Sequence, residues 1–168
     1  TWADFDNDGW LDLYANGTLY QNKSGIFIDI TPEVIRENVG GYGALWADYD
    51  GDGGMDLTLS SRNHYIIHNL PPDEQANSFL KVMVLDARGR YTRPGSEIRL
   101  YSARTNELIC TGIVDTGSGY NAQSVMPVHF GLRDEYLVNV EITSLTQQGR
   151  KTIRLADIDP QTYIGHVL

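Results

Sequence analysis

Near its start the chain reads Trp2-Ala3-Asp4-Phe5-Asp6-Asn7-Asp8-Gly9-Trp10-Leu11-Asp12-Leu13, and the pattern returns as Trp46-Ala47-Asp48-Tyr49-Asp50-Gly51-Asp52-Gly53-Gly54-Met55-Asp56-Leu57. Both copies have the form D-x-D-x-D-G-x-x-D, with four carboxylates in nine residues. Carboxylates this close repel one another unless a cation lies among them. Oxygen ligands at alternate positions, followed by a glycine, are the opening of a calcium-binding loop. The sequence therefore predicts two calcium sites.

Each predicted site consists of four side-chain carboxylates and one backbone carbonyl. The ligands of the first site are Asp4, Asp6, Asp8 and Asp12 with the backbone carbonyl of Trp10. The ligands of the second site are Asp48, Asp50, Asp52 and Asp56 with the backbone carbonyl of Gly54. The alternative is an acidic surface turn without a metal, and two aligned copies of the loop argue against it.

These loops differ from the EF-hand, which has a bidentate glutamate at its twelfth position and a helix on each side. Here the twelfth position is Ala15 in the first loop and Leu59 in the second, so we expect the aspartate at position nine to close each loop. Apolar residues alternate with others after each loop, which is the periodicity of a strand. The pattern predicts a tight turn between two strands.

The net charge of −9 has a local origin. The chain has 22 acidic and 13 basic residues, and without the eight loop aspartates 14 acidic residues would stand against 13 basic ones. The acidity is therefore concentrated in the two loops. This distribution argues against an acidic disordered tail, and against nucleic-acid binding, which needs a basic face.

The spacing of the loops predicts the first part of the fold. Asp48 follows Asp4 by 44 residues, a period typical of the four-stranded blades of a β-propeller. Residues 1–70 therefore read as a partial propeller, with one whole blade and pieces of two neighbours. Since the chain opens inside the first loop, without a methionine, we expect it to be a piece of a longer protein.

A polar, proline-led linker is predicted at residues 71–77. Beyond it, residues 78–168 contain six or seven short apolar runs separated by turns, the last of them at 163–168. This pattern indicates a β-sandwich. The sequence thus predicts an all-β chain, with a partial β-propeller followed by a β-sandwich.

Two sets of residues resemble known modules. Leu19-Tyr20-Gln21-Asn22, Gly25-Ile26-Phe27 and Asp29-Ile30-Thr31, followed by the second acidic loop, resemble the FG-GAP/VCBS propeller repeat. The second half resembles the ASPIC/UnbV domain, on Asn77-Ser78-Phe79-Leu80-Lys81-Val82, Pro94-Gly95-Ser96-Glu97-Ile98, Gly117-Ser118-Gly119-Tyr120 and His129-Phe130-Gly131-Leu132. The two modules together resemble the cartilage acidic protein (CRTAC) family.

The resemblance implies a secreted, calcium-binding, non-catalytic protein with a role in extracellular interaction or adhesion, and with a protein or glycan as partner. The second loop departs from the first, because Gly54 stands where the first has Trp10. The alternative function is a carbohydrate-binding or carbohydrate-active protein, since propellers and sandwiches host both.

Other signals in the sequence are weaker. His64 and His68 have the spacing of a zinc pair on a helix, but the residues between them favour a strand, and no acidic third ligand lies nearby in the sequence. Ser118, His129 and Asp115 contain the residue types of a catalytic triad, but not the spacing of a nucleophile elbow. We therefore expect no enzyme.

The remaining features of the sequence bear on the cellular compartment of the protein. No apolar run reaches the length of about 20 residues that spans a bilayer, and no signal-peptide pattern opens the chain. The single cysteine, Cys110, has no partner for an internal disulfide and is expected to be a packed thiol. Asn16 and Asn22 begin glycosylation sequons.

Overall fold

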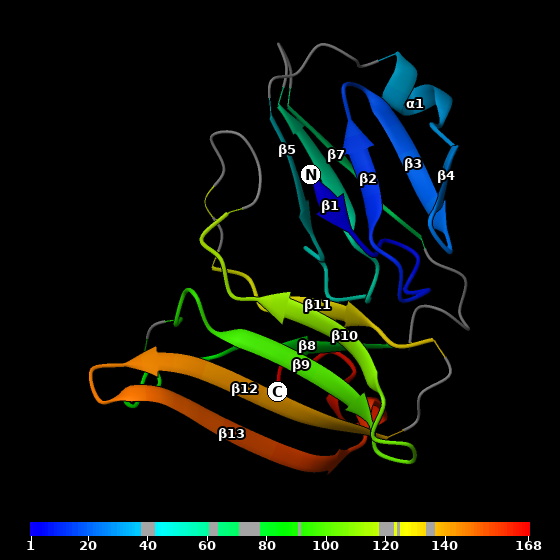
Figure 1. Ribbon diagram of the computed structural model, residues 1–168. Helices are drawn as coiled ribbons and strands as arrows, with labels where there is room; N and C mark the ends of the chain where they lie inside the picture. Colours follow the sequence, from blue (N-terminus) through cyan, green and yellow to red (C-terminus); the bar gives the residue numbers. More distant parts are fainter. Residues whose placement is uncertain are drawn as a thin grey trace.

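The computed structural model describes residues 1–37, 43–60, 64–70, 78–90, 92–117, 123, 125–133 and 137–168. The chain is an all-β protein with 50% strand and 6% helix, as the sequence predicts. It has two parts, one above the other in Figure 1. No helix in the described ranges is long and apolar enough to cross a membrane.

The first part consists of two antiparallel sheets. One has the order β1-β2-β3-β4, formed by β1 (Trp2–Ala3), β2 (Asp12–Ala15), β3 (Thr18–Lys23) and β4 (Ile26–Asp29). A short helix follows, α1 (Glu33–Arg36). The other sheet has the order β5-β6-β7, formed by β5 (Gly43–Ala47), β6 (Asp56–Ser60) and β7 (His64–Ile67).

The acidic loops join equivalent strand pairs. Ala3 pairs with Asp12 across β1 and β2, and Ala47 pairs with Asp56 across β5 and β6. Each loop is therefore a turn between antiparallel strands, which confirms the prediction from the alternation of apolar residues. The described residues form no closed propeller, in agreement with a partial one.

The two sheets pack against each other through apolar side chains. The rings of Phe5 and Trp46 are stacked, with their centroids 6.0 Å apart and an interplanar angle of 9°. Leu19, Ile35 and Leu57 are buried in the same core. The turn between β3 and β4 is Ser24-Gly25, with φ values of 54° and 94°, the left-handed pair of a type I′ hairpin.

The second part has two layers around its own core. The larger sheet has the order β10-β9-β12-β13, from β9 (Glu97–Ser102), β10 (Leu108–Ile113), β12 (Val138–Thr146) and β13 (Gly149–Ile158). The smaller layer pairs β8 (Phe79–Val82) with β11 (Val128–Gly131). The core includes Leu80, Ile98, Leu100, Val138 and Val140, which come from both layers.

The strand expected at residues 163–168 is wrong. A 3₁₀ helix, η1 (Pro160–Tyr163), ends at its first residue, and a turn follows in which the N–H of His166 donates to the carbonyl of Tyr163 at 2.8 Å. The end of the chain still bonds to β8 and its neighbour: the N–H of Leu168 donates to the carbonyl of Lys81 at 3.0 Å, and the carbonyl of Leu168 accepts from Met83 at 3.1 Å. Backbone bonds thus hold this terminus without a regular strand.

Residues 78–168, produced alone, are expected to unfold in one cooperative transition and to keep a β-sheet circular dichroism spectrum. The reason is that this part has a separate core, in which Leu80, Ile98, Leu100 and Val138 are fully buried. Thermal and urea unfolding would measure this. A spectrum without sheet would contradict the boundary predicted at residues 71–77.

Candidate metal centre

The two acidic loops share most of their internal hydrogen bonds, and they differ at the first aspartate: Asp48 Oδ1 accepts from the N–H of Gly51 at 2.7 Å, whereas Asp4 Oδ1 has no partner among the described residues. The first aspartate of each loop accepts a backbone N–H five residues ahead: Asp4 Oδ2 accepts from Gly9 at 2.9 Å, and Asp48 Oδ2 accepts from Gly53 at 3.2 Å. The middle aspartates accept from backbone N–H groups two residues ahead. These bonds are Asp8 N to Asp6 Oδ1, Trp10 N to Asp8 Oδ1, Asp52 N to Asp50 Oδ1 and Gly54 N to Asp52 Oδ1.

The last aspartate of each loop ties the loop to the sheet beside it. Asp12 is fully buried, and its two oxygens accept from the backbone of Phe5 at 3.1 Å and of Asn22 at 2.8 Å. The equivalent bonds in the second loop run to Asp56 from Tyr49 at 3.1 Å and from Asn69 at 2.8 Å. The repeated sequence therefore folds twice into one local structure.

The carboxylates converge within each loop. Asp4, Asp6 and Asp8 each place an oxygen within 4.8 Å of the others, and so do Asp48, Asp50 and Asp56. Ligands bound to calcium at roughly 2.3–2.6 Å are at most about 5 Å apart, so this spacing fits a calcium ion. Asp12 lies outside the first triad. Asp52 lies outside the second triad. Calcium ligation by every predicted ligand, including the carbonyls of Trp10 and Gly54, stays a prediction.

In the absence of a metal, the burial of carboxylates beside one another destabilises the folded loops. Loss of hydration, together with the nearby Asp6 and Asp8, raises the pKa of Asp4 to about 7. Burial raises the pKa of Asp12 to about 7 as well, and it raises the pKa of Asp56. Asp4 Oδ1 is buried and has no hydrogen-bond partner within the described residues. An unsatisfied carboxylate oxygen facing other carboxylates is the donor that a hard cation requires.

The second loop also meets a histidine. His68 Nε2 lies 2.9 Å from Asp50 and 3.5 Å from Asp52, and these three residues form a further group that could hold a metal. The structure therefore brings to His68 two acidic side chains that are distant from it in the sequence. β7 pairs antiparallel with β6, with Ile67 opposite Leu57, so its end returns to the acidic loop that precedes β6. This pairing gives no signal in the local spacing.

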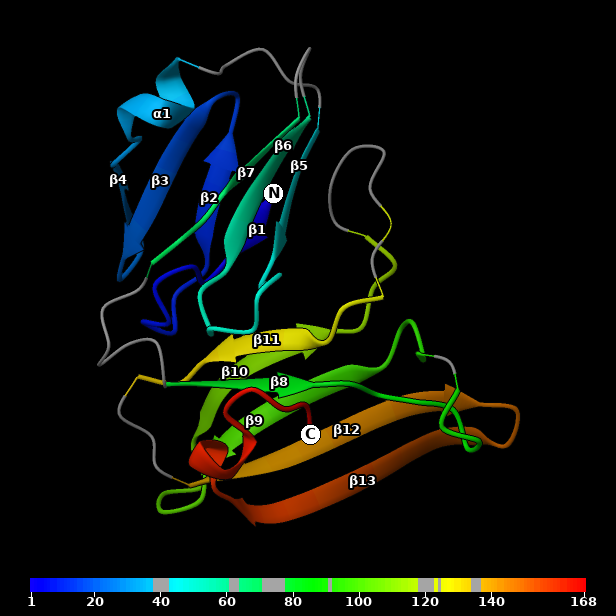
Figure 2. The ribbon, with the colours of Figure 1, turned by 180° about the vertical axis from the view of Figure 1, so that it is seen from behind.

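Four of the described residues of the second part contact the acidic loops. In Figures 1 and 2, β11 lies at the junction, beneath both loops. Lys81 Nζ lies 2.9 Å from Asp48 Oδ2, and the two side chains are only 11% and 3% exposed. The other three are His129, Gly131 and Arg133. The acidic loops are thus the docking surface for the second part.

Asn7 is at the centre of this junction. Its side chain is 2% exposed; its amide donates to the carbonyl of Gly53 at 2.9 Å, and its Oδ1 lies 2.7 Å from His129 Nε2. It therefore connects the first loop to the second loop and to β11. Sequence reasoning missed Asn7, because the loop pattern allows any residue between its aspartates.

Arg133 contacts the first loop at this junction. Its guanidinium donates to the carbonyl of Asp8 and lies over the ring of Trp10, 5.1 Å from the ring centroid. A cation over an indole face is an attractive contact. Of the three residues weighed and set aside as a catalytic triad, Ser118 lies outside the described residues.

Comparison with protein families matches residues 4–58 to the FG-GAP-like repeat. The matched span includes both acidic loops and the strands β2, β3, β4 and β5. The chain therefore contains an FG-GAP-like repeat, as the resemblance of its first half predicts. The same comparison found no ASPIC/UnbV domain. No curated protein and no solved structure matches the chain.

In calcium-free buffer at about pH 8, the Asp4→Asn variant is expected to melt at a higher temperature than the parent. The folded-state pKa of Asp4 is about 7 against an ordinary 3.8, so the folded parent binds the proton more tightly than the unfolded chain. Its stability therefore falls as the pH rises from about 4 to 7. Near pH 6 the difference in melting temperature between the variant and the parent should be smaller than at pH 8.

Melting curves in EDTA at the two pH values test this. Asp157→Asn, which changes an exposed aspartate, is the matched control. An Asp4→Asn gain that is equal at both pH values would contradict the proposed buried charge.

Gly131→Ala is expected to destabilise the whole chain by about 1–3 kcal/mol or more. A Cβ at this position would lie 2.0 Å from Asp4 Oδ2 and 2.6 Å from the Cα of Asn7. Urea unfolding measures the loss. In residues 78–168 alone the same change should cost little, because Asp4 and Asn7 are absent; an equal cost in both chains would mean that the junction is not the cause.

Proposed function

We propose that the two acidic loops bind calcium and that the chain is a calcium-stabilised, non-catalytic module for extracellular interaction. The observation that carries this proposal is the repeated loop structure, in which three carboxylates converge within 4.8 Å in each copy. The unsatisfied, buried Asp4 Oδ1 supports it independently.

The donor set favours calcium over other divalent ions. The converging side chains of each triad are carboxylates, and zinc prefers nitrogen and sulfur ligands. Magnesium requires a tight octahedron and retains several waters, whereas calcium accepts six to eight oxygens in a flexible arrangement. An irregular loop with carboxylates and carbonyls suits the calcium ion better. Bound calcium would supply positive charge among these aspartates.

We propose a structural role for this ion. The loops connect paired strands, and their aspartates are bonded to backbone N–H groups at both loop ends. Neutralising these carboxylates would stabilise both hairpins and the junction with β8 and β11. Modules outside the cell bind calcium at roughly 10⁻⁴–10⁻³ M, so such sites would be filled in extracellular fluid.

The exposed apolar side chains of β4 support an interaction role. Ile26, Phe27 and Ile28 are all exposed on the outer strand of the first sheet. An edge strand with exposed apolar residues is a surface that another protein segment covers. We therefore propose a secreted protein whose partner is another protein or a glycan, with residues 78–168 as an ASPIC/UnbV-like domain of a CRTAC-type chain.

Calcium is expected to raise the melting temperature of the chain, and magnesium is not. For a Kd of roughly 10⁻⁴ M, about 5 mM calcium adds about 2 kcal/mol per site. Two sites would add about 4 kcal/mol, or roughly 8–16 °C for a chain of this size. Differential scanning calorimetry in EDTA, calcium and magnesium measures the shift.

The double variant Asp4→Asn, Asp48→Asn is expected to lose the calcium-dependent shift. The charge-matched control, Asp157→Asn with Glu107→Gln, lies outside the loops and should retain it. A full calcium-dependent shift in the loop variant would show that these loops are not the calcium sites. A larger shift with zinc than with calcium would indicate a zinc site at Asp50, Asp52 and His68.

A further inference from the structure

The second sheet packs on the first through one particular face. In Figure 1 the sheet β1-β2-β3-β4 lies in front of the sheet β5-β6-β7, and Figure 2 shows the reverse. The face that the second sheet turns towards the first has Trp46, Leu57 and Ile67 side by side, one on each strand. All three lie in the core between the two sheets.

The equivalent face of the first sheet is exposed. Trp2, Leu13 and Tyr20 lie side by side on β1, β2 and β3, at the positions that the three core residues take in the second sheet. Trp46 is only 8% exposed, whereas its equivalent Trp2 is 52% exposed. One repeated position is therefore buried between sheets in one copy and open to solvent in the other.

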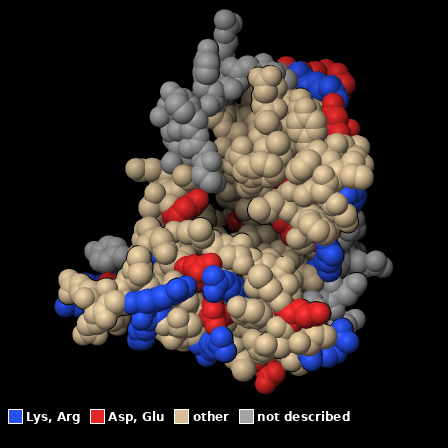
Figure 3. Space-filling view, in the orientation of Figure 1, with Lys and Arg blue, Asp and Glu red and all other residues tan. Residues whose placement is uncertain are grey.

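An aromatic pair spans this outer face. Phe27 of β4 is 43% exposed, and its ring meets the ring of Trp2 edge to face, with the centroids 6.0 Å apart. Because β1 and β4 are the two edges of the sheet, the pair extends across the strands between them. In Figure 3, which shows this side of the molecule, uncharged residues form the surface over β1 and β2. A continuous apolar surface of this kind marks an interaction site.

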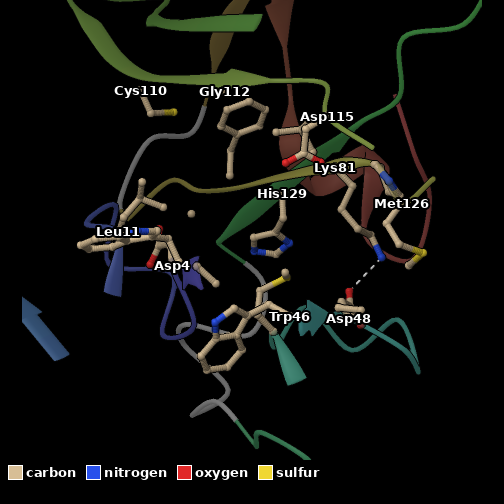
Figure 4. Close-up of a pocket in the computed structure, with 18 of the residues that line it drawn as sticks. Asp4, Leu11, Trp46, Asp48, Lys81, Cys110, Gly112, Asp115, Met126 and His129 are labelled. Atoms are coloured by element: carbon tan, nitrogen blue, oxygen red, sulfur yellow. Dashed lines mark hydrogen bonds and ion pairs between the residues drawn. The ribbon is translucent and has the colours of Figure 1, made fainter. Parts of the chain in front are cut away.

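The second part of the chain docks beneath this face. Lys81 pairs with Asp48, and a cavity of about 570 Å³ lies between the two parts at this junction (Figure 4). His129 contacts Asn7 in the first loop. Trp2 contributes to the lining of the cavity and is still half exposed. These contacts run to the acidic loops at the ends of the strands, and they leave the outer face of the first sheet accessible.

The outer face of the second sheet has the residue types that would cover it. Between the sheets, the ring of Phe5 stacks on Trp46. Phe5 follows the first aspartate of its loop, and Tyr49 is the equivalent residue of the second loop. Tyr49 is 54% exposed. Ile66, which takes the position of the buried Leu19, is 59% exposed. The chain thus presents both halves of its own inter-sheet interface to solvent, one on each sheet.

We propose that copies of this chain associate head to tail, with the outer face of the first sheet of one copy packed on the outer face of the second sheet of the next. Tyr49 of one copy would stack on Trp2 of its neighbour, as Phe5 stacks on Trp46 within the chain. Removal of both apolar faces from water drives the association. Because two different faces meet, the interface is heterologous, and each copy added leaves one face of each kind open.

This inference rests on the interaction role proposed above and names the partner as a second copy of the chain. A chain that melts at a higher temperature in calcium but stays monomeric would keep its calcium sites and contradict the self-association. A chain that associates but shows no shift with calcium would contradict the calcium sites alone. The two failures are therefore distinguishable.

Sedimentation velocity of the full chain in millimolar calcium tests the association. Concentrations from roughly 1 μM to 1 mM cover moderate and weak affinities. The average mass should rise with concentration above the mass of one chain. A mass that stays at that of one chain over the whole range would overturn the proposal.

Two variants test which faces meet. Trp2→Asp places a charge on the outer face of the first sheet, and Ile66→Asp places one on the outer face of the second. Each should weaken self-association at least about tenfold, because a few central apolar anchors carry most of the binding energy of an interface. An equal mixture of the two variants should form a heterodimer and stop there, since each variant retains the face that the other has lost. A mixture that stays monomeric would overturn the head-to-tail arrangement, as would variants that associate like the parent.

Leu145→Asp is the matched control, because it places the same charge at a 77% exposed apolar position of β12, in the second part. It should associate as the parent does, and a loss of association in this variant would overturn the assignment to the two faces. Thermal unfolding confirms that each variant is folded. Phe27→Asp provides a second test of the first face, with the same expected loss, if Trp2→Asp does not fold.

Discussion

Asp4, Asp12 and Asp56 are carboxylates that the fold removes from water beside other carboxylates. Their raised pKa values measure the cost: in the absence of a metal, the folded chain holds these charges less well than the unfolded chain does. Backbone N–H groups offset part of that cost, because Asp12 and Asp56 each accept two of them. The stability of the loops, and of the parts packed against them, depends on the positive charge that balances the remaining carboxylates.

The same loops carry the contacts between the two parts. Asn7 bonds to the second loop and to His129, while Lys81 contacts Asp48 and Gly131 leaves room for Asp4. A disturbance of either loop therefore reaches β8 and β11 through short, buried contacts. Because the cavity has walls from both parts, its shape depends on the same junction. Loop order, docking and cavity geometry are thus linked by direct contacts.

Local features of this chain could be predicted from its sequence, and non-local ones could not. The acidic loops, the Ser24-Gly25 turn and the alternation of β9 follow from spacing and from backbone preferences. The approach of His68 to Asp50 depends on the antiparallel pairing of β7 with β6. The pairing of Lys81 with Asp48 joins residues in different parts of the fold. Such pairs leave no periodic signal, so only the folded structure reveals them.

The two loops have one pattern but different surroundings. Asp48 lies against the buried ammonium of Lys81, so the protein itself balances part of the charge of the second loop. In the first loop, the half-exposed Lys23 lies 3.7 Å from Asp6 and Asp8, and Asp4 Oδ1 has no partner among the described residues. The first loop therefore has more uncompensated charge, and a divalent cation should stabilise it more. Lys81 of the second part, together with the bond from the N–H of Gly51 to Asp48 Oδ1, thus makes two copies of one motif unequal.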